Sequence, residues 1–258
     1  MDDFKPTAVP SQHQKLGEVH RVCPTHGAYV AGVYRWGEMS CKSCHEAALK
    51  AAERAEQQAR HVLHMSQRSR HARNAAHIPE RFADRLLSNY IPVCPAAQYA
   101  LEVAERFVSE FGTVQTQGRS LIFCGHVGNG KTHLAIGIAH ELIKKMRYPL
   151  FMSVLNAVRH VKETWRKDSV RSESQAIRDF IEPDLLILDE VGVQFGSDTE
   201  KLILFEIING RYNRKKSTLL LSNLMVQELS SYLGEPVIDR LREGGGIAVP
   251  FTWASYRA

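Results

Sequence analysis

An apolar segment that runs directly into a glycine-rich loop constrains this chain more than any other feature. Residues 121–124 read LIFC, and residues 125–132 read GHVGNGKT, a G-x-x-x-x-G-K-T pattern that opens a helical stretch. In such a loop the backbone N–H groups converge on phosphate oxygens, the lysine adds a point charge and the threonine hydroxyl holds Mg²⁺. The predicted nucleotide-binding residues are Gly125, Val127, Gly128, Asn129, Gly130, Lys131, Thr132 and His133. The alternative is a glycine-rich structural turn.

A second apolar segment, residues 184–190, reads DLLILDE and ends in two acidic residues. A buried parallel strand of this kind carries functional groups at its C-terminal end. Asp189 is predicted to complete the Mg²⁺ site together with Thr132, and Glu190 to act as the general base toward the attacking water. An ordinary strand followed by an acidic loop is the alternative.

Candidate strands alternate with candidate helices through the rest of the chain. The strands are expected at 121–124, 149–153, 185–189, 218–222 and 247–251. This alternation indicates an α/β fold, with a parallel sheet that is flanked by helices on both faces.

Asn223 directly follows one of these strands. Its amide is predicted to reach the γ-phosphate, or to orient the water together with Glu190. A cap of the next helix is an equally open interpretation of Asn223.

Composition and charge limit the class of protein. At 258 residues with 44% hydrophobic content, the chain can bury one α/β domain of ordinary size and a small additional module. Lys and Arg number 33 against 28 acidic residues, a modest excess that is compatible with a polyanionic partner. No apolar run approaches the roughly 18 residues that a membrane-spanning helix needs, and the first residues lack the apolar region of a signal peptide. We expect a cytoplasmic protein without a membrane partner.

Cysteine and histidine residues near the N-terminus predict a zinc site. Residues 23–26 read CPTH and residues 41–45 read CKSCH, separated by a segment expected to form a short hairpin over 28–40, with Gly32 and Gly37 as turn candidates. Two such knuckles suit a tetrahedral Zn²⁺ held entirely by protein, and therefore a structural site. The predicted ligands are Cys23, His26, Cys41 and Cys44, with His45 as the spare. The alternative is a loop of reduced cysteines; the roles of Cys94 and Cys124 beyond packing stay open.

Residues 46–74 contain neither Gly nor Pro and are rich in Ala, Gln, Arg and His, which predicts a helix. Arg and His residues without an acidic neighbour crowd residues 60–73, a density that suits phosphates or an acidic protein surface; a solvated spacer helix is the alternative. The sequence His77-Ile78-Pro79 then breaks the helix. The expected organisation is a zinc-knuckle module at 1–45, a basic helical arm for partner docking at 46–77 and a nucleotide-binding domain at 78–258.

The order of motifs resembles the DnaC-type replicative helicase loaders of bacteria and phages, AAA+ ATPases related to the IstB-type transposition ATPases. The resemblance covers roughly residues 78–257 and rests on HIPERF at 77–82, GHVGNGKTHLA at 125–135, LLILDEVGVQ at 185–194, SN at 222–223, LGEPVIDRL at 233–241 and FTWASYR at 251–257. It implies an AAA+ P-loop fold that uses ATP and Mg²⁺.

Two arginines acquire roles from this resemblance. Arg240 is implied to be the arginine finger that reaches a neighbouring subunit's nucleotide, and Arg257 the second sensor that reaches the γ-phosphate of its own subunit. A rigid delocalised cation suits both roles because it stabilises charge on phosphate oxygens. A surface ion pair is the alternative for each. The family commonly has another Arg where this chain has Pro236, so a nucleotide contact from that position is lost.

Trp165, Arg166 and Lys167 combine an indole with cations, a pattern that suits stacking on one base while neutralising phosphates. By the resemblance, this segment grips single-stranded DNA. A buried Trp on an amphipathic helix is the alternative. Phe195 is the candidate to replace a DNA-contacting aromatic that related loaders carry near Thr199.

The predicted function is ATP-dependent loading of a DnaB-type replicative helicase onto single-stranded DNA during replication initiation. ATP between neighbouring subunits would drive self-association, and the N-terminal module and arm would dock the helicase. Two alternatives stay open: an IstB-like transposition ATPase that acts on duplex DNA, and an ATP-switched adaptor that scarcely hydrolyses. The presence of both Glu190 and Arg240 counts against the adaptor.

Overall fold

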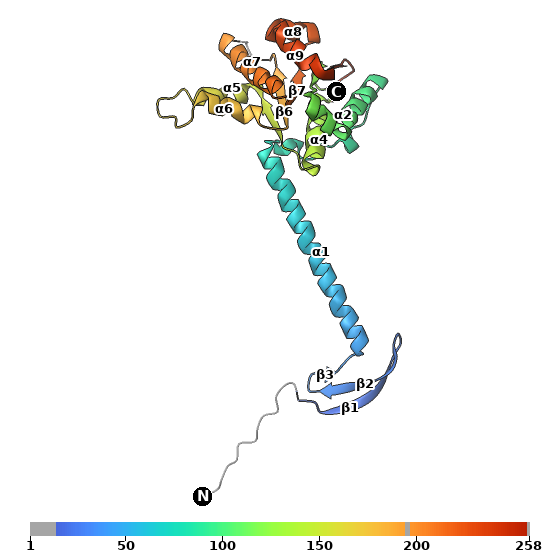
Figure 1. Ribbon diagram of the computed structural model, residues 1–258. Coiled ribbons are helices and arrows are strands. Elements are labelled where there is room, and N and C mark those ends of the chain that lie inside the picture. The colour runs from blue at the N-terminus through green and yellow to red at the C-terminus, as the bar shows by residue number, and fades with distance from the viewer. Residues whose placement is uncertain (1–13, 194–196, 257–258) are drawn as a thin grey trace. The chain divides into compact units, whose positions relative to one another are not determined.

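The computed structural model describes residues 14–193 and 197–256, without the side chains of residues 59–73. The chain divides into two compact units, Met1–Gln67 and Arg68–Ala258. Helix α1 (Lys42–Ala75) contributes to both and confirms the predicted helix (Figure 1). It ends where the sequence predicts, because Pro79 has an extended backbone and His77 takes a positive φ of 54°.

The N-terminal unit carries a small antiparallel sheet of β1 (Gly17–Cys23), β2 (Gly27–Tyr34) and β3 (Gly37–Glu38). The expected hairpin is present as β2 and β3, with Gly37 just after its turn. The prediction of a turn at Gly32 is wrong, because β2 runs unbroken through that residue in register with Glu18 of β1. Gly32 instead leaves room for the ring of Tyr34, which lies 2.9 Å from where a Cβ would stand.

The second unit contains a parallel sheet with the strand order β5-β6-β7-β4-β8. Its strands are β4 (Leu121–Gly125), β5 (Pro149–Ser153), β6 (Leu185–Val191), β7 (Ser217–Ser222) and β8 (Ile247–Phe251). All five predicted strands are therefore confirmed. Strand β4 lies between two strands that come much later in the chain: Leu121 pairs with Leu219 of β7 and with Ile247 of β8.

Helices cover both faces of this sheet (Figure 1). One layer holds α2 (Pro95–Ser109), α3 (Phe111–Gln117) and α4 (Lys131–Lys144), with the short η1 (Glu80–Phe82) and η2 (Leu87–Asn89) beside it. The other holds α5 (Val154–Glu163), α6 (Glu173–Ile181), α7 (Asp198–Asn213), α8 (Val226–Leu233) and α9 (Glu235–Arg242); η3 (Glu243–Gly245) leads into β8.

Alternate residues of each strand enter opposite layers. Leu121 and Phe123 pack against α2–α4, whereas Ile122 and Cys124 pack against the other layer. Burial on both faces explains why these strands read as continuous apolar runs. Within the described residues, no helix combines the length and apolar character that crossing a membrane requires.

Candidate nucleotide site and metal centre

The C-terminal ends of β4, β6 and β7 border a cavity of about 450 Å³. Parallel strands bring these ends to one edge of the sheet, where ligands of α/β proteins bind. The predicted residues that line the cavity are Val127, Gly128, Asn129, Gly130, Lys131, Thr132, His133, Asp189, Glu190 and Asn223. Gly125 lies just behind it as the buried last residue of β4.

A second wall of the cavity was not predicted from the sequence. It comes from the segment around η1 and η2 and from the end of the chain: Arg81, Phe82, Arg85, Asn89, Tyr90, Ile91 and Tyr256. Arg81, Phe82 and Tyr256 belong to the HIPERF and FTWASYR motifs, which the sequence marked without assigning them to the cavity.

Lys131 is folded back onto the loop that precedes it. Its Nζ donates to the carbonyl oxygens of Gly125 at 2.7 Å and His126 at 2.6 Å. Burial lowers the pKa of Lys131 to about 8. The two carbonyl oxygens are neutral, so a bound phosphate would give the Lys131 ammonium group an anionic partner.

The predicted magnesium ligands meet at the start of α4. Thr132 Oγ1 donates a hydrogen bond to Asp189 Oδ2 at 3.1 Å. Burial raises the pKa of Asp189 above its ordinary value, which indicates a carboxylate that would gain from a nearby cation. A hydroxyl and a carboxylate oxygen at this spacing fit the hard-oxygen coordination that Mg²⁺ requires.

An irregular backbone at the end of β6 leaves Asp189 half-buried and Glu190 exposed. The pairing of β6 with β7 is irregular between Leu188 and Val191, and Glu190 takes a φ of 63°, a costly conformation for a residue with a side chain. Its N–H donates to Asp189 Oδ1 at 2.8 Å. Asp189 is therefore held inside the site, while the exposed Glu190 carboxylate borders the cavity where a water could attack.

Ser222 joins the ends of β6 and β7 and was not predicted. Its buried Oγ donates to the Val191 carbonyl at 2.7 Å and accepts from the Leu224 N–H at 3.0 Å. Asn223 lies between Ser222 and Leu224 in the sequence and lines the same cavity as Glu190. The sequence offered only the S-N pair at a strand end as a signal.

His133 holds the second wall of the cavity. Its Nε2 lies 2.9 Å from the Leu86 carbonyl oxygen and 3.0 Å from Asn89 Oδ1, so this nitrogen is the donor. Asn89 Nδ2 donates to the Asp84 carbonyl, which fixes the amide with its oxygen toward His133. Burial lowers the pKa of His133 and favours the neutral ring.

The predicted arginines are not all brought to this cavity. Arg240 does not line the cavity; its guanidinium carbon lies 5.1 Å from the ring centroid of Phe205 and 5.8 Å from that of Tyr212. Pro236 occupies the first turn of α9. Arg257 and Phe195 lie outside the described residues.

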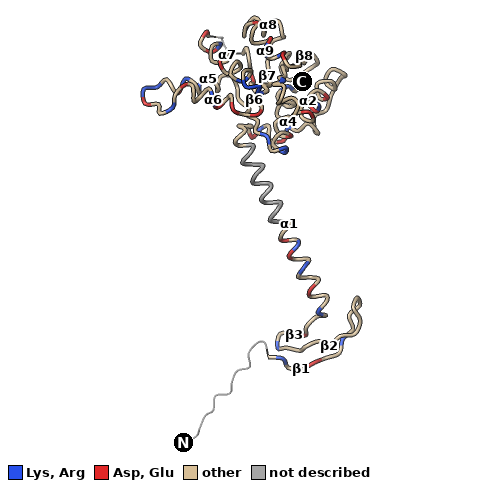
Figure 2. Tube along the Cα trace, in the orientation of Figure 1, with Lys and Arg blue, Asp and Glu red and all other residues tan. Residues whose placement is uncertain are grey.

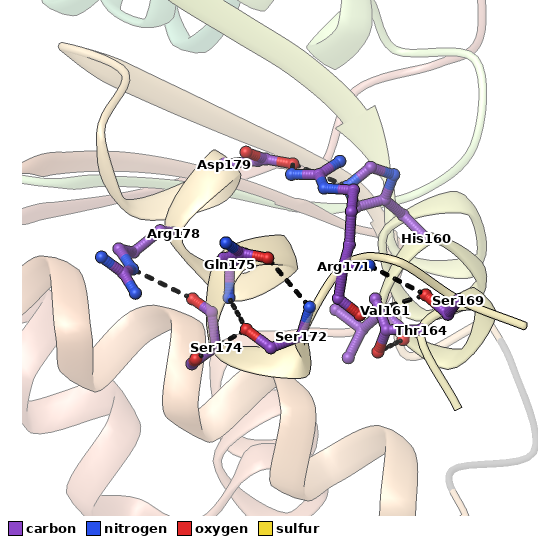
Figure 3. A network of polar contacts seen from close by, with 10 residues as sticks. All are labelled: His160, Val161, Thr164, Ser169, Arg171, Ser172, Ser174, Gln175, Arg178 and Asp179. Atoms are coloured by element: carbon purple, nitrogen blue, oxygen red, sulfur yellow. Dashed lines mark hydrogen bonds and ion pairs between the residues drawn. The ribbon is translucent and has the colours of Figure 1, made fainter. Parts of the chain in front are cut away.

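The predicted DNA-contacting residues follow α5. Trp165 is 50% exposed, which excludes the buried-Trp alternative, and its indole N–H donates to Glu173 Oε2 at 2.9 Å. Arg166 and Lys167 are exposed, and basic residues gather on this α5–α6 loop (Figure 2). Asp179 braces the loop, because it accepts from Arg171 at 2.6 Å and from His160 at 2.8 Å (Figure 3).

The four predicted zinc ligands converge in the N-terminal unit. Their ligand atoms all lie within 4.8 Å of one another; His26 Nδ1 is 3.6, 3.7 and 3.3 Å from the sulfurs of Cys23, Cys41 and Cys44. A tetrahedron with Zn–S of about 2.3 Å and Zn–N of about 2.0 Å has edges of roughly 3.5 to 3.8 Å. The cluster therefore fits zinc.

Comparison with known proteins gives the family. The profile of the IstB-like ATP binding proteins matches residues 42–242. The chain belongs to this IstB-like family. Its relatives include the replicative helicase loader DnaC of Escherichia coli K12, 39% identical over 171 residues, which are 66% of this chain and 68% of that protein. The DnaC of Buchnera aphidicola from Acyrthosiphon pisum is 35% identical over 180 residues, 70% of this chain and 72% of that one.

Solved structures agree with this assignment. A crystal structure of the DnaC helicase loader matches with a TM-score of 0.60 and 25% identity, over 67% of this chain and 99% of that one. The resemblance to the DnaC-type loaders, the AAA+ fold and the ATP-binding class of this IstB-like chain are thereby confirmed. Cys23, His26 and Cys41 precede the residues that the family profile matches.

Proposed function

We propose that the chain is an ATP-dependent loader of a replicative DNA helicase. The observation that carries this proposal is the 39% identity to a protein named replicative helicase loader over two thirds of the chain. The cavity supports it, because residues suited to bind and hydrolyse ATP border one space.

In the proposed reaction, the backbone N–H groups of the loop and Lys131 bind the phosphates of ATP. Thr132 and Asp189 would hold Mg²⁺, which would supply positive charge beside the phosphate oxygens. Glu190 accepts the proton of the attacking water, and Asn223 orients that water or the γ-phosphate. Arg240 acts on the nucleotide of a neighbouring subunit, and Arg257 on that of its own.

Assembly and DNA binding follow from the same nucleotide. ATP between subunits drives self-association, which arranges Trp165, Arg166 and Lys167 of successive subunits along single-stranded DNA. The exposed indole and the two exposed cations support this role, because stacking and phosphate neutralisation both need accessible groups.

The zinc-knuckle module and the basic arm dock the replicative helicase. A structural Zn²⁺ on Cys23, His26, Cys41 and Cys44 would keep this module folded, since those four ligands leave no open coordination position. His45 lies outside this cluster.

The test combines the purified chain, its host's replicative helicase, ATP and closed circular single-stranded DNA. We expect a complex that forms only with ATP and leaves the helicase on the circle. An absence of helicase binding under all nucleotide conditions would overturn the proposal.

Substitution of the general base separates hydrolysis from binding. Glu190→Gln keeps the side chain's shape and removes the proton acceptor, so we expect ATP turnover to fall by about 10² to 10⁴-fold while ATP still binds. Phosphate release and equilibrium binding measure the two effects, with Glu206→Gln on α7 as a control. Unchanged turnover would contradict the role of Glu190.

A second candidate is an ATPase of transposition, which the IstB-like family match favours. Such a protein would assemble on duplex DNA without a helicase. ATP-dependent filaments on duplex DNA, together with no helicase binding, would favour this function over loading.

A further inference from the structure

The phosphate-binding loop leaves the sheet beside the last segment of the described chain, residues 252–256, here called the C-terminal segment. Gly125 of β4 pairs with Phe251 of β8, so both loops begin at the same point of the sheet edge. The His126 N–H continues the pairing, because it donates to the Phe251 carbonyl at 3.1 Å. The C-terminal segment is therefore placed to touch the whole phosphate-binding loop.

Two donors of the C-terminal segment bind successive carbonyls of that loop. The Tyr256 N–H donates to the Gly128 carbonyl oxygen at 3.0 Å, and the Trp253 indole Nε1–H donates to that of Asn129 at 3.1 Å. Asn129 returns a hydrogen bond from its side-chain Nδ2 to the Trp253 carbonyl. The Trp253 ring is fixed in turn against Phe251, with ring centroids 4.7 Å apart.

The segment is also anchored on its far side and packed tightly. The Tyr256 hydroxyl donates to the carbonyl of Ile91, which also lines the cavity, at 2.8 Å. A Cβ on Gly128 would stand 2.1 Å from Ser255 Oγ, and φ is +84° at this glycine. The C-terminal segment thus leaves the loop no room to shift toward it.

These bonds decide where the N–H groups of the loop point. In a trans peptide the C=O and the next N–H lie on opposite sides, and the described chain has no cis peptide bond. The Asn129 carbonyl and the Gly130 N–H belong to one peptide unit. Because the carbonyl points toward the Trp253 indole, the Gly130 N–H points away from Trp253. Gly130 lines the nucleotide cavity, and backbone N–H groups are what such loops offer to phosphates.

We propose that Trp253 is a positioning residue of the nucleotide site, whose indole N–H aims the Gly130 N–H at the phosphates of the bound nucleotide. This inference rests on the proposed ATP binding and assigns a role to a residue outside the usual phosphate-loop pattern. Trp253 touches no phosphate itself; it acts through the orientation of one peptide unit.

The test is Trp253→Phe, which keeps an aromatic ring against Phe251 and removes the N–H. Affinities for ATP, ADP and adenosine are measured by competition against a fluorescent ATP analogue with Mg²⁺ present. Loss of one hydrogen bond should weaken ATP and ADP by about three- to tenfold, while adenosine binding stays unchanged. Trp36→Phe, in the other unit, is the matched control.

Each outcome is decisive. An equal loss for all three ligands would assign Trp253 a packing role only, and unchanged affinities would also overturn the inference. Failure of the unsubstituted protein to bind ATP would instead remove the proposed function.

If Trp253→Phe does not fold, the amide resonance of Gly130 in the unsubstituted protein gives the answer. We expect it to shift with ADP and not with adenosine; no shift with ADP would contradict the proposal.

Discussion

Among residues 14–58 of the N-terminal unit, only Cys23, Ala31 and Cys41 are buried, whereas both faces of the five-stranded sheet are covered by apolar side chains. Val22 on β1 is 78% exposed and Trp36 is 62% exposed. Burial of apolar surface can stabilise the second unit, Arg68–Ala258, here called the nucleotide unit. Residues 14–58 of the N-terminal unit bury too little apolar surface for that. We infer from this comparison that a metal ion on Cys23, His26, Cys41 and Cys44 would replace a core in the N-terminal unit.

Loss of the proposed zinc site is expected to have the largest effect on this difference between the two units. Cys41→Ser or a strong chelator should unfold β1–β3, because structural zinc contributes an apparent 10 to 16 kcal/mol in small modules, and should leave ATP binding intact. Metal analysis, circular dichroism and nucleotide binding measure the three quantities. Cys94→Ser, outside the cluster, is the control. A metal-free protein with an intact N-terminal unit would contradict the comparison.

Arg211 has the largest fully buried side chain among the described residues, although it is charged. It is fully buried, and its guanidinium donates to the carbonyls of Phe180, Ile181, Pro183 and Ser217 and to the Thr218 hydroxyl. Arg211→Met would leave these buried acceptors without a hydrogen-bond donor, so we expect the free energy of unfolding of the nucleotide unit to fall by about 3 to 5 kcal/mol.

Denaturant unfolding measures this change, and Arg214→Met is the matched control. The exposed Arg214 pairs with Glu182 at the surface, which predicts a loss of no more than about 1 kcal/mol. Equal losses for the two variants would show that the buried network adds nothing to the apolar core.

A pH effect on the nucleotide unit is the smallest expected change. The pKa of Lys131 is lowered to about 8, so the free protein loses this charge as pH rises through that value. A bound phosphate should raise this pKa toward 10.5, so that binding takes up a proton between about pH 8 and 10.5 and ATP affinity falls by up to about tenfold per pH unit there. Calorimetry in buffers of different ionisation enthalpy measures the uptake, and pH-independent affinity from 7 to 9.5 would contradict it.

The sheet and the strand ends that border the cavity were predictable because apolar runs and the polar residues that follow them are local patterns. Leu185 to Glu190 shows both features within a few residues. The second wall of the cavity was not predictable, since His133 meets Leu86 and Asn89 only after the chain has folded. Gly32 was misread because a glycine under an aromatic ring and a glycine in a turn look alike in sequence.

The residues of the nucleotide site likewise divide into those that a sequence pattern predicts and those that it does not. Lys131, Thr132 and Asp189 follow known spacing, and the structure brings them together at one cavity. Ser222 and Trp253 bind backbone carbonyls beside the cavity, as Arg211 does in the core of the unit, and no residue pattern predicts which carbonyls a side chain will reach. Roles that depend on another subunit, such as that of Arg240, remain predictions.

The position of β4 has a consequence for how the protein is made. During synthesis this strand emerges from the ribosome well before β7 and β8, its two neighbours in the sheet. Until those strands follow, the backbone N–H and C=O groups of β4 have no neighbouring strand to hydrogen-bond. The loop after β4 also lacks the hydrogen bond from Trp253 to the Asn129 carbonyl. A nascent chain that already contains the complete G-x-x-x-x-G-K-T sequence should therefore be unable to bind ATP until β8 and Trp253 have left the ribosome.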